Sequence, residues 1–110
     1  MTAHKKELIF YEVLGGKAPL EEWLSDLKDR KARAVIRARL DRLENGNAGK
    51  CDSLGDGLYE LKIYFGPGYR VYFGTDGPVL VILLCGGDKG SQRQDVEKAR
   101  HYWADHRRRL

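Results

Sequence analysis

The chain contains little cysteine and no long apolar run, and each shortage excludes a class of protein. Its two cysteines, Cys51 and Cys85, lack the spacing of metal ligands, so we expect no metal centre. The longest apolar run, Val79 to Cys85, is far too short to span a membrane. The N-terminal segment has no long apolar region and is therefore not a signal peptide. Two cysteines without an export signal are typical of reduced thiols, and we expect a cytoplasmic protein with no membrane partner.

The composition that remains is that of an ordinary soluble domain. The chain has 110 residues, of which 42% are hydrophobic and 33% are charged, which suits one globular domain over residues 1–110. The net charge of +4 permits a nucleic acid or an acidic protein as partner. The GxG of "FGPGYR" is a turn and not a dinucleotide fingerprint, because no helix follows it. We therefore expect no cofactor.

Apolar periodicity and turn residues predict an α+β fold. In chain order, the predicted elements are a strand at Glu7–Leu14, helices at 18–29 and Arg30–Glu44, a hairpin of strands at Leu58–Phe65 and Tyr69–Gly74, a strand buried on both faces at Val79–Cys85, and a last helix that begins after Ser91 with a capping box to Gln94. This order predicts an N-terminal strand and a helical hairpin packed on a small antiparallel β-sheet, with a C-terminal helix.

The predicted hairpin places polar side chains on one face of the sheet. With Gly66–Gly68 as the loop, Tyr64 pairs with Arg70 and Lys62 pairs with Tyr72. One face then carries two cations, a carboxylate and two phenols, from Glu60, Lys62, Tyr64, Arg70 and Tyr72. Such a set suits a phosphodiester, because arginine and lysine bind phosphate oxygens and tyrosine stacks on bases. Lys89 lies just past the predicted central strand, in a glycine-rich turn, and is within reach of the same region. A sheet face that is simply solvated has the same pattern.

The helix at Arg30–Glu44 offers a second basic surface. Seven basic residues lie between positions 28 and 42, and Arg33 and Arg37 are candidates for binding nucleic acid. A solvated helix face explains the same residues equally well.

Three segments together resemble a known family. They are "EEWLSDLKDRKARAVIRARLDRLENGNAG", "GLYELKIYFGPGYRVYF" and "LLCGGDKGSQRQDVEKA", and the resemblance extends from Phe10 to Trp103. The sequence resembles the RelE/ParE superfamily of type II toxin–antitoxin toxins, and within it the HigB-like addiction module killer proteins, also described as phage-derived Gp49-like proteins. The family fold, a small sheet packed against a helical hairpin, agrees with the predicted order of elements.

The resemblance implies an activity and partners. RelE-like and HigB-like toxins are metal-independent endoribonucleases that cut mRNA in the ribosomal A site and so inhibit translation. We therefore expect the ribosome and mRNA as partners, together with a cognate helix-turn-helix antitoxin that neutralises the toxin in a hetero-oligomer. Two alternatives stay open: a ParE-like gyrase inhibitor without nuclease activity, and a decayed toxin that only binds its antitoxin.

The resemblance also implies roles for individual residues. Arg70 matches the arginine that stabilises charge on the scissile phosphate, and Lys89 matches a basic residue that binds the phosphate. Lys62 matches a lysine that either binds the phosphate or helps in proton transfer. Glu60 stands where RelE has a basic residue, so either it is the general base or it only pairs with Lys62. RelE has a tyrosine in its last helical segment, where this chain reads "RQDVEKA", and Tyr64 or Tyr72 is a candidate to stack on a base instead.

Overall fold

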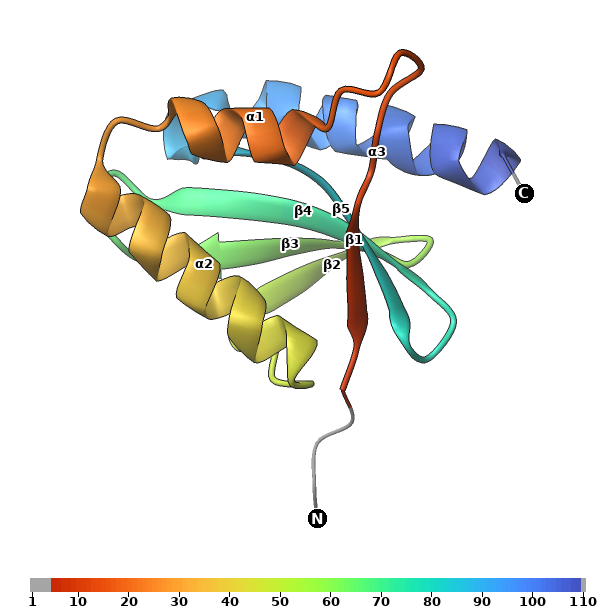
Figure 1. Ribbon diagram of the computed structural model, residues 1–110, viewed down its shortest axis with the longest axis horizontal. Coiled ribbons are helices and arrows are strands. Elements are labelled where there is room, and N and C mark those ends of the chain that lie inside the picture. Colours follow the sequence, from red (N-terminus) through yellow and green to blue (C-terminus); the bar gives the residue numbers. More distant parts are fainter. Residues whose placement is uncertain (1–4, 110) are drawn as a thin grey trace.

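The computed structural model describes residues 5–109 and contains one sheet between two layers of helices (Figure 1). Its elements are β1 (Glu7–Phe10), α1 (Pro19–Asp26), α2 (Arg30–Glu44), β2 (Cys51–Gly55), β3 (Leu58–Ile63), β4 (Tyr69–Asp76), β5 (Leu80–Asp88), the 3₁₀ turn η1 (Lys89–Ser91) and α3 (Gln92–Arg108). The sheet order is β1-β5-β4-β3-β2.

Strands β2 to β5 form an antiparallel meander, and β1 pairs parallel to β5 at the edge. The predicted α+β fold is therefore confirmed, and the predicted bounds of α2 are those of the structure. The predicted strands differ from the structure in several places, and β5 continues to Asp88 beyond its predicted end at Cys85. The first strand ends at Phe10 and not at Leu14, and β2 was not predicted at all. The segment "CDSLG" of β2 contains no β-branched or aromatic residue, so the usual strand signal is missing.

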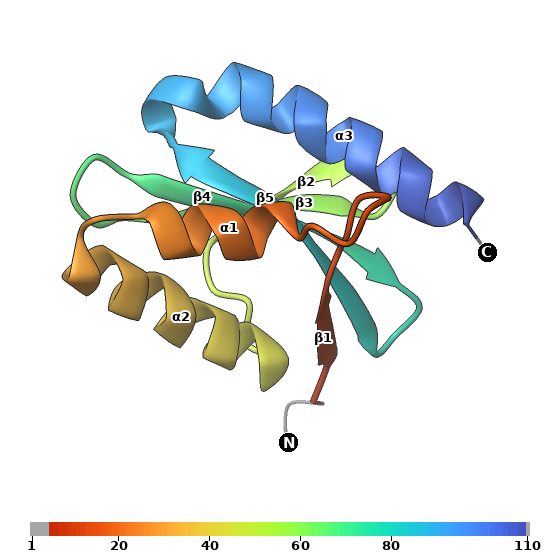
Figure 2. The same cartoon turned by 45° about the horizontal axis from the view of Figure 1, so that its top comes forward.

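The helices cover opposite faces of the sheet (Figure 2). Helices α1 and α2 pack on the face that carries Leu61, Ile63, Val71 and other apolar side chains. Helix α3 packs on the other face, against a second cluster that includes Tyr72. The face that the sequence predicted as polar is thus largely covered by α3. It is neither a fully solvated face nor an open platform.

The start and the end of α3 are fixed by specific contacts. Trp103 packs over Gly74 of β4, where any larger side chain would collide with the indole ring. The Trp103 indole also donates a hydrogen bond to the carbonyl of Asp56, 2.8 Å away. The predicted capping box is wrong, because Ser91 bonds to the side chain of Asp95, and Asp88 accepts the backbone N–H groups of Gly90 and Ser91. These contacts hold the first turn of α3 beside the ends of β4 and β5.

The β3–β4 hairpin has a longer loop than predicted. Ile63 pairs with Tyr69 and Lys62 pairs with Arg70, so the loop covers residues 64–68. The register differs from the predicted one by two residues, which leaves each strand residue on its predicted face. Tyr64 is the exception, because it leaves the strand and lies 74% exposed in the loop.

No helix within residues 5–109 is long and apolar enough to cross a membrane.

Candidate functional site

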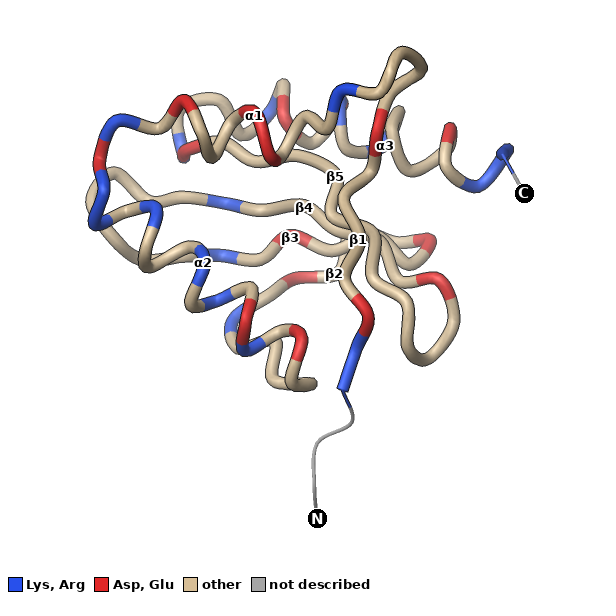
Figure 3. Tube along the Cα trace, in the orientation of Figure 1, with Lys and Arg blue, Asp and Glu red and all other residues tan. Residues whose placement is uncertain are grey.

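A cleft of about 310 Å³ lies where the β3–β4 loop meets η1. Its lining residues come from the ends of β3 and β4, from the loop and from η1: Lys62, Ile63, Tyr64, Phe65, Gly66, Pro67, Gly68, Tyr69, Arg70 and Lys89. Three of these residues are cationic and none is acidic. Figure 3 shows the basic residues of β3 and β4 side by side toward the same end of the sheet. The cleft is therefore electropositive and suits an anionic ligand.

Arg70 is the most buried of the three cations. It projects from β4, and its side chain is only 13% exposed. Its Nε lies 3.8 Å from Oε2 of Glu60, while its Nη1 is buried and has no hydrogen-bond partner among residues 5–109. A buried donor without an acceptor costs about 1–3 kcal/mol. The guanidinium is thus held on one side and left unsatisfied on another.

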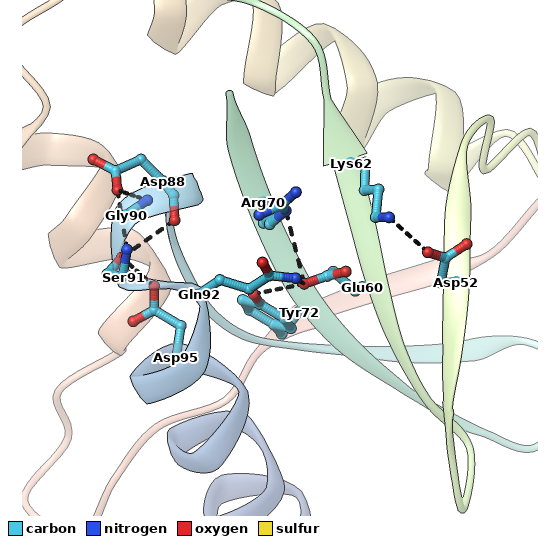
Figure 4. Close-up of polar contacts among 10 residues, drawn as sticks. All are labelled: Asp52, Glu60, Lys62, Arg70, Tyr72, Asp88, Gly90, Ser91, Gln92 and Asp95. Atoms are coloured by element: carbon cyan, nitrogen blue, oxygen red, sulfur yellow. Dashed lines mark hydrogen bonds and ion pairs between the residues drawn. The ribbon is translucent and has the colours of Figure 1, made fainter. Parts of the chain in front are cut away.

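Glu60 lies on β3 behind Arg70 and is buried, with 3% exposure. Its Oε2 accepts hydrogen bonds from the Tyr72 hydroxyl at 2.8 Å and from the Gln92 amide at 2.9 Å (Figure 4). Glu60 does not line the cleft, and it does not form an ion pair with Lys62. The expected pairing of Glu60 with Lys62 is therefore wrong. Glu60 instead contacts Arg70.

Tyr72 is fully buried, and its ring belongs to the core beneath α3. Burial and the hydrogen bond to Glu60 raise the pKa of the Tyr72 hydroxyl well above its ordinary value, so it remains a proton donor. The ring has no free face for a nucleotide base. The expectation that Tyr72 stacks on RNA is therefore corrected, because α3 covers the side chain.

Lys62 reaches the cleft from β3, next to Arg70, and its ammonium lies 2.7 Å from Oδ2 of Asp52 on β2. The hydrogen bond between the two groups raises the pKa of Lys62 and lowers the pKa of Asp52. Lys62 is thus a stable positive charge and a poor proton acceptor. Sequence reasoning missed Asp52, because recognising it required the unpredicted strand β2.

Lys89 is exposed in η1, directly after β5. Its backbone N–H bonds to the carbonyl of Gly68 at 3.0 Å, which joins η1 to the β3–β4 loop. Gly68 has a φ of +85°, a backbone conformation that favours glycine. The structure therefore brings Lys62, Arg70 and Lys89 together, as the sequence predicted.

The other predicted contacts with RNA are spread out. Tyr64 lines the cleft and is exposed, so its ring is free to stack. Arg33 is half-buried and Arg37 is exposed, and both lie on α2, outside the cleft. Arg37 borders a separate groove of about 260 Å³ beside β1. Arg39, on the same helix, instead binds the carbonyls of Lys62 and Ala48 and ties α2 to the sheet.

Gln92 and Asp52 are the polar residues of this region that sequence reasoning missed. Gln92 opens α3 and is the sole contact from that helix to Glu60 among the hydrogen bonds of residues 5–109. No spacing rule in the sequence pairs positions 60 and 92, since the contact depends on where α3 docks. Within the same residues, no group of three or more His, Cys, Asp or Glu side chains is arranged to hold a metal ion.

Comparison with known proteins gives a family. The family model described as phage derived protein Gp49-like (DUF891) matches residues 22–109, which include the cleft and α3. An uncharacterized protein of Haemophilus influenzae (strain Rd) is 51% identical over 80 residues, which cover 73% of this chain and 81% of that protein. The chain therefore belongs to the phage-derived Gp49-like family.

Proposed function

We propose that this protein is the toxin of a type II toxin–antitoxin system and that it cleaves mRNA on the ribosome. The observation that carries the proposal is the cleft in which Arg70, with an unsatisfied buried donor, lies beside Lys62 and Lys89. A phosphate bound there would give the guanidinium an acceptor and offset part of the positive charge of the cleft. Membership of the Gp49-like family supports a toxin-like protein of phage origin.

The proposed reaction is the internal transesterification of RNA. The 2′-oxygen loses its proton and attacks the adjacent phosphorus in line. The bond from phosphorus to the 5′-oxygen then breaks, and that oxygen takes up a proton. The products are a cyclic phosphate and a 5′-hydroxyl end. Arg70 would stabilise the additional charge on the phosphate oxygens, which is a large contribution to catalysis in a preorganised site.

The surrounding residues would bind and orient the substrate. Lys62 and Lys89 would contribute positive charge on two sides of the phosphate, and the pairing with Asp52 keeps Lys62 protonated. The exposed ring of Tyr64, at the same cleft, would stack on a base next to the scissile bond. The exposed Arg37 and the half-buried Arg33 would contact the RNA backbone farther away, on the ribosome.

The test is primer extension on one mRNA in a purified translation system. Wild type should produce cuts at A-site codons that require ribosomes. Arg70→Ala should lower cleavage by about 100-fold or more, because it removes the principal charge at the phosphate. Lys98→Ala is the matched control, since Lys98 is exposed on α3 outside the cleft. It should cleave like the wild type.

An intact message with folded wild-type protein would reject the nuclease. DNA damage in cells that produce the protein would then support gyrase inhibition, and the absence of both effects would support a decayed toxin. A folded Arg70→Ala protein that cleaves like the wild type would reject the role of Arg70.

The proposal includes a cognate helix-turn-helix antitoxin as partner. A gene for such a protein is expected beside the toxin gene, and its product should abolish cleavage when mixed with this protein in equal amounts. A neighbouring product that leaves cleavage unchanged would contradict the partnership.

A further inference from the structure

We infer that Gln92 is a positioning residue that sets the place of Arg70 through Glu60, an inference that rests on the proposed function. Three groups converge on one oxygen, Oε2 of Glu60: the Tyr72 hydroxyl at 2.8 Å, the Gln92 amide at 2.9 Å and the Arg70 Nε at 3.8 Å. Figure 4 shows all three side chains reaching toward this carboxylate.

The carboxylate is suited to anchor a cation. Glu60 is 3% exposed, so its negative charge is stable only with donors around it. The Tyr72 hydroxyl and the Gln92 amide supply part of that stabilisation. Because both donors are neutral, the negative charge of Glu60 still attracts Arg70. The Arg70 contact is at Nε, which leaves the terminal nitrogens of the guanidinium outside the pair. Glu60 therefore holds the arginine from behind without covering the end that a phosphate needs.

Gln92 connects this anchor to α3. It is the first residue of α3, and the contacts of Asp88 with Gly90 and Ser91 fix the chain immediately before it. Tyr72 is locked in the core, whereas Gln92 is only partly buried. Substituting Gln92 thus removes one donor from the carboxylate with little change in packing. In this role Glu60 is not a general base, because its hydrogen-bonded Oε2 acts on Arg70 and not on RNA.

The experiment compares Gln92→Met with Gln94→Met. Methionine has about the length of glutamine and no donor, and Gln94 is exposed on the same helix without a contact to Glu60. The measured quantities are the single-turnover cleavage rate at saturating RNA and the affinity for a 2′-deoxy analogue that cannot be cleaved. Gln92→Met should cleave about 10-fold more slowly with affinity within about twofold of wild type. Gln94→Met should match the wild type in both.

A double variant tests whether Gln92 acts through Arg70. Arg70→Lys retains a cation but has no Nε–H to meet Glu60. On that background, Gln92→Met should slow cleavage by less than about twofold, because coupled residues are non-additive. An equal 10-fold loss on both backgrounds would overturn the inference, and so would wild-type cleavage by Gln92→Met. If Gln92→Met does not fold, Gln92→Asn, which withdraws the same amide by one methylene, replaces it with the same expectations.

A spectroscopic measurement separates this inference from the proposed function. The Arg70 Nε–H signal in a ¹⁵N NMR spectrum should exchange slowly with water in the wild type and faster in Gln92→Met. Wild type that cleaves RNA, with a signal unchanged by Gln92→Met, would reject positioning and keep the nuclease. Wild type that does not cleave RNA, with a signal that does change, would reject the nuclease and keep positioning.

Discussion

The two faces of the sheet are packed in different ways. The face beneath α1 and α2 buries an apolar cluster, in which Leu61, Ile63 and Val71 are almost completely covered. The face beneath α3 also buries a core, but Glu60 lies under the start of that helix, hydrogen-bonded to Tyr72 and Gln92. The first face can be stabilised by burial alone. The second maintains a buried charge, and the cationic cleft opens beside it.

This difference separates stability from function in one small domain. A buried polar network lowers the stability of the fold unless each member has a hydrogen-bond partner. A well-packed apolar face elsewhere in the domain can compensate for that loss. Two buried donors lack a partner among residues 5–109, Nε of Arg39 and Nη1 of Arg70. The Arg70 donor is the informative one, since it occurs next to the cleft, beside the well-bonded Glu60.

Leu61→Ala should break the apolar face. Leu61 is fully buried between the sheet and the α1/α2 layer, so the variant loses apolar contacts and leaves a cavity. We expect the free energy of unfolding to fall by about 2–5 kcal/mol, measured by urea denaturation. Cleavage per folded molecule should be unchanged. A loss of less than about 1 kcal/mol would mean that this face is not the main source of stability.

Salt should weaken RNA binding at the other face. When the three cleft cations contact phosphates, counterions are released from the RNA. For a single strand, this gives a slope of about −2 in a plot of log affinity against log salt concentration. Affinity should therefore fall roughly 20-fold between 50 and 200 mM salt, measured by fluorescence anisotropy with a 2′-deoxy analogue. Lys89→Ala should make the slope shallower by about 0.7. Binding that does not respond to salt would contradict a phosphate site.

The hydrogen-bond network should appear when two tyrosines of β4 are compared. Tyr72→Phe removes a donor from Glu60 and should lower the free energy of unfolding by about 1–3 kcal/mol. Tyr69 is also buried but belongs to the opposite face, and its hydroxyl has no side-chain hydrogen bond among residues 5–109. Tyr69→Phe should therefore be nearly neutral in the same urea denaturation. Equal losses for the two variants would show that the Glu60 network adds nothing to the core.

The sequence predicted which side chains share a face of the β3–β4 hairpin better than it predicted what packs against those faces. Lys62 and Arg70 share a face despite a register error of two residues, since side chains alternate with a period of two. The burial of Tyr72 was not predictable in this way, because it depends on how α3 docks through Trp103 on Gly74. Asp52 was missed with β2, whose residues have weak strand preference. Local pattern thus identified the cations, and tertiary packing determined their partners.

The smallest expected effect concerns the far end of α3, where polar contacts hold the helix to the segment after β1. Asp105 accepts the Tyr11 hydroxyl at 2.6 Å and pairs with Arg109 at 2.6 Å. The hydrogen bond from Tyr11 and the charges of Arg109 and Arg108 lower the pKa of Asp105. Since the folded pKa is below the unfolded value near about 3.9, this contribution is complete above pH 4 and is lost as the pH falls through the folded pKa.

The same contact has a second limit at alkaline pH. Burial and the bond to Asp105 raise the pKa of Tyr11 to about 12, so its contribution is present below the unfolded value near about 10 and is lost above it.

Asp105→Asn should therefore flatten the decline of the urea midpoint between about pH 5 and pH 2.5. Asp26→Asn, at an exposed position on α1, should retain the wild-type slope. If both variants follow the wild type, the acid sensitivity arises elsewhere, and the contacts of Asp105 do not contribute to holding α3.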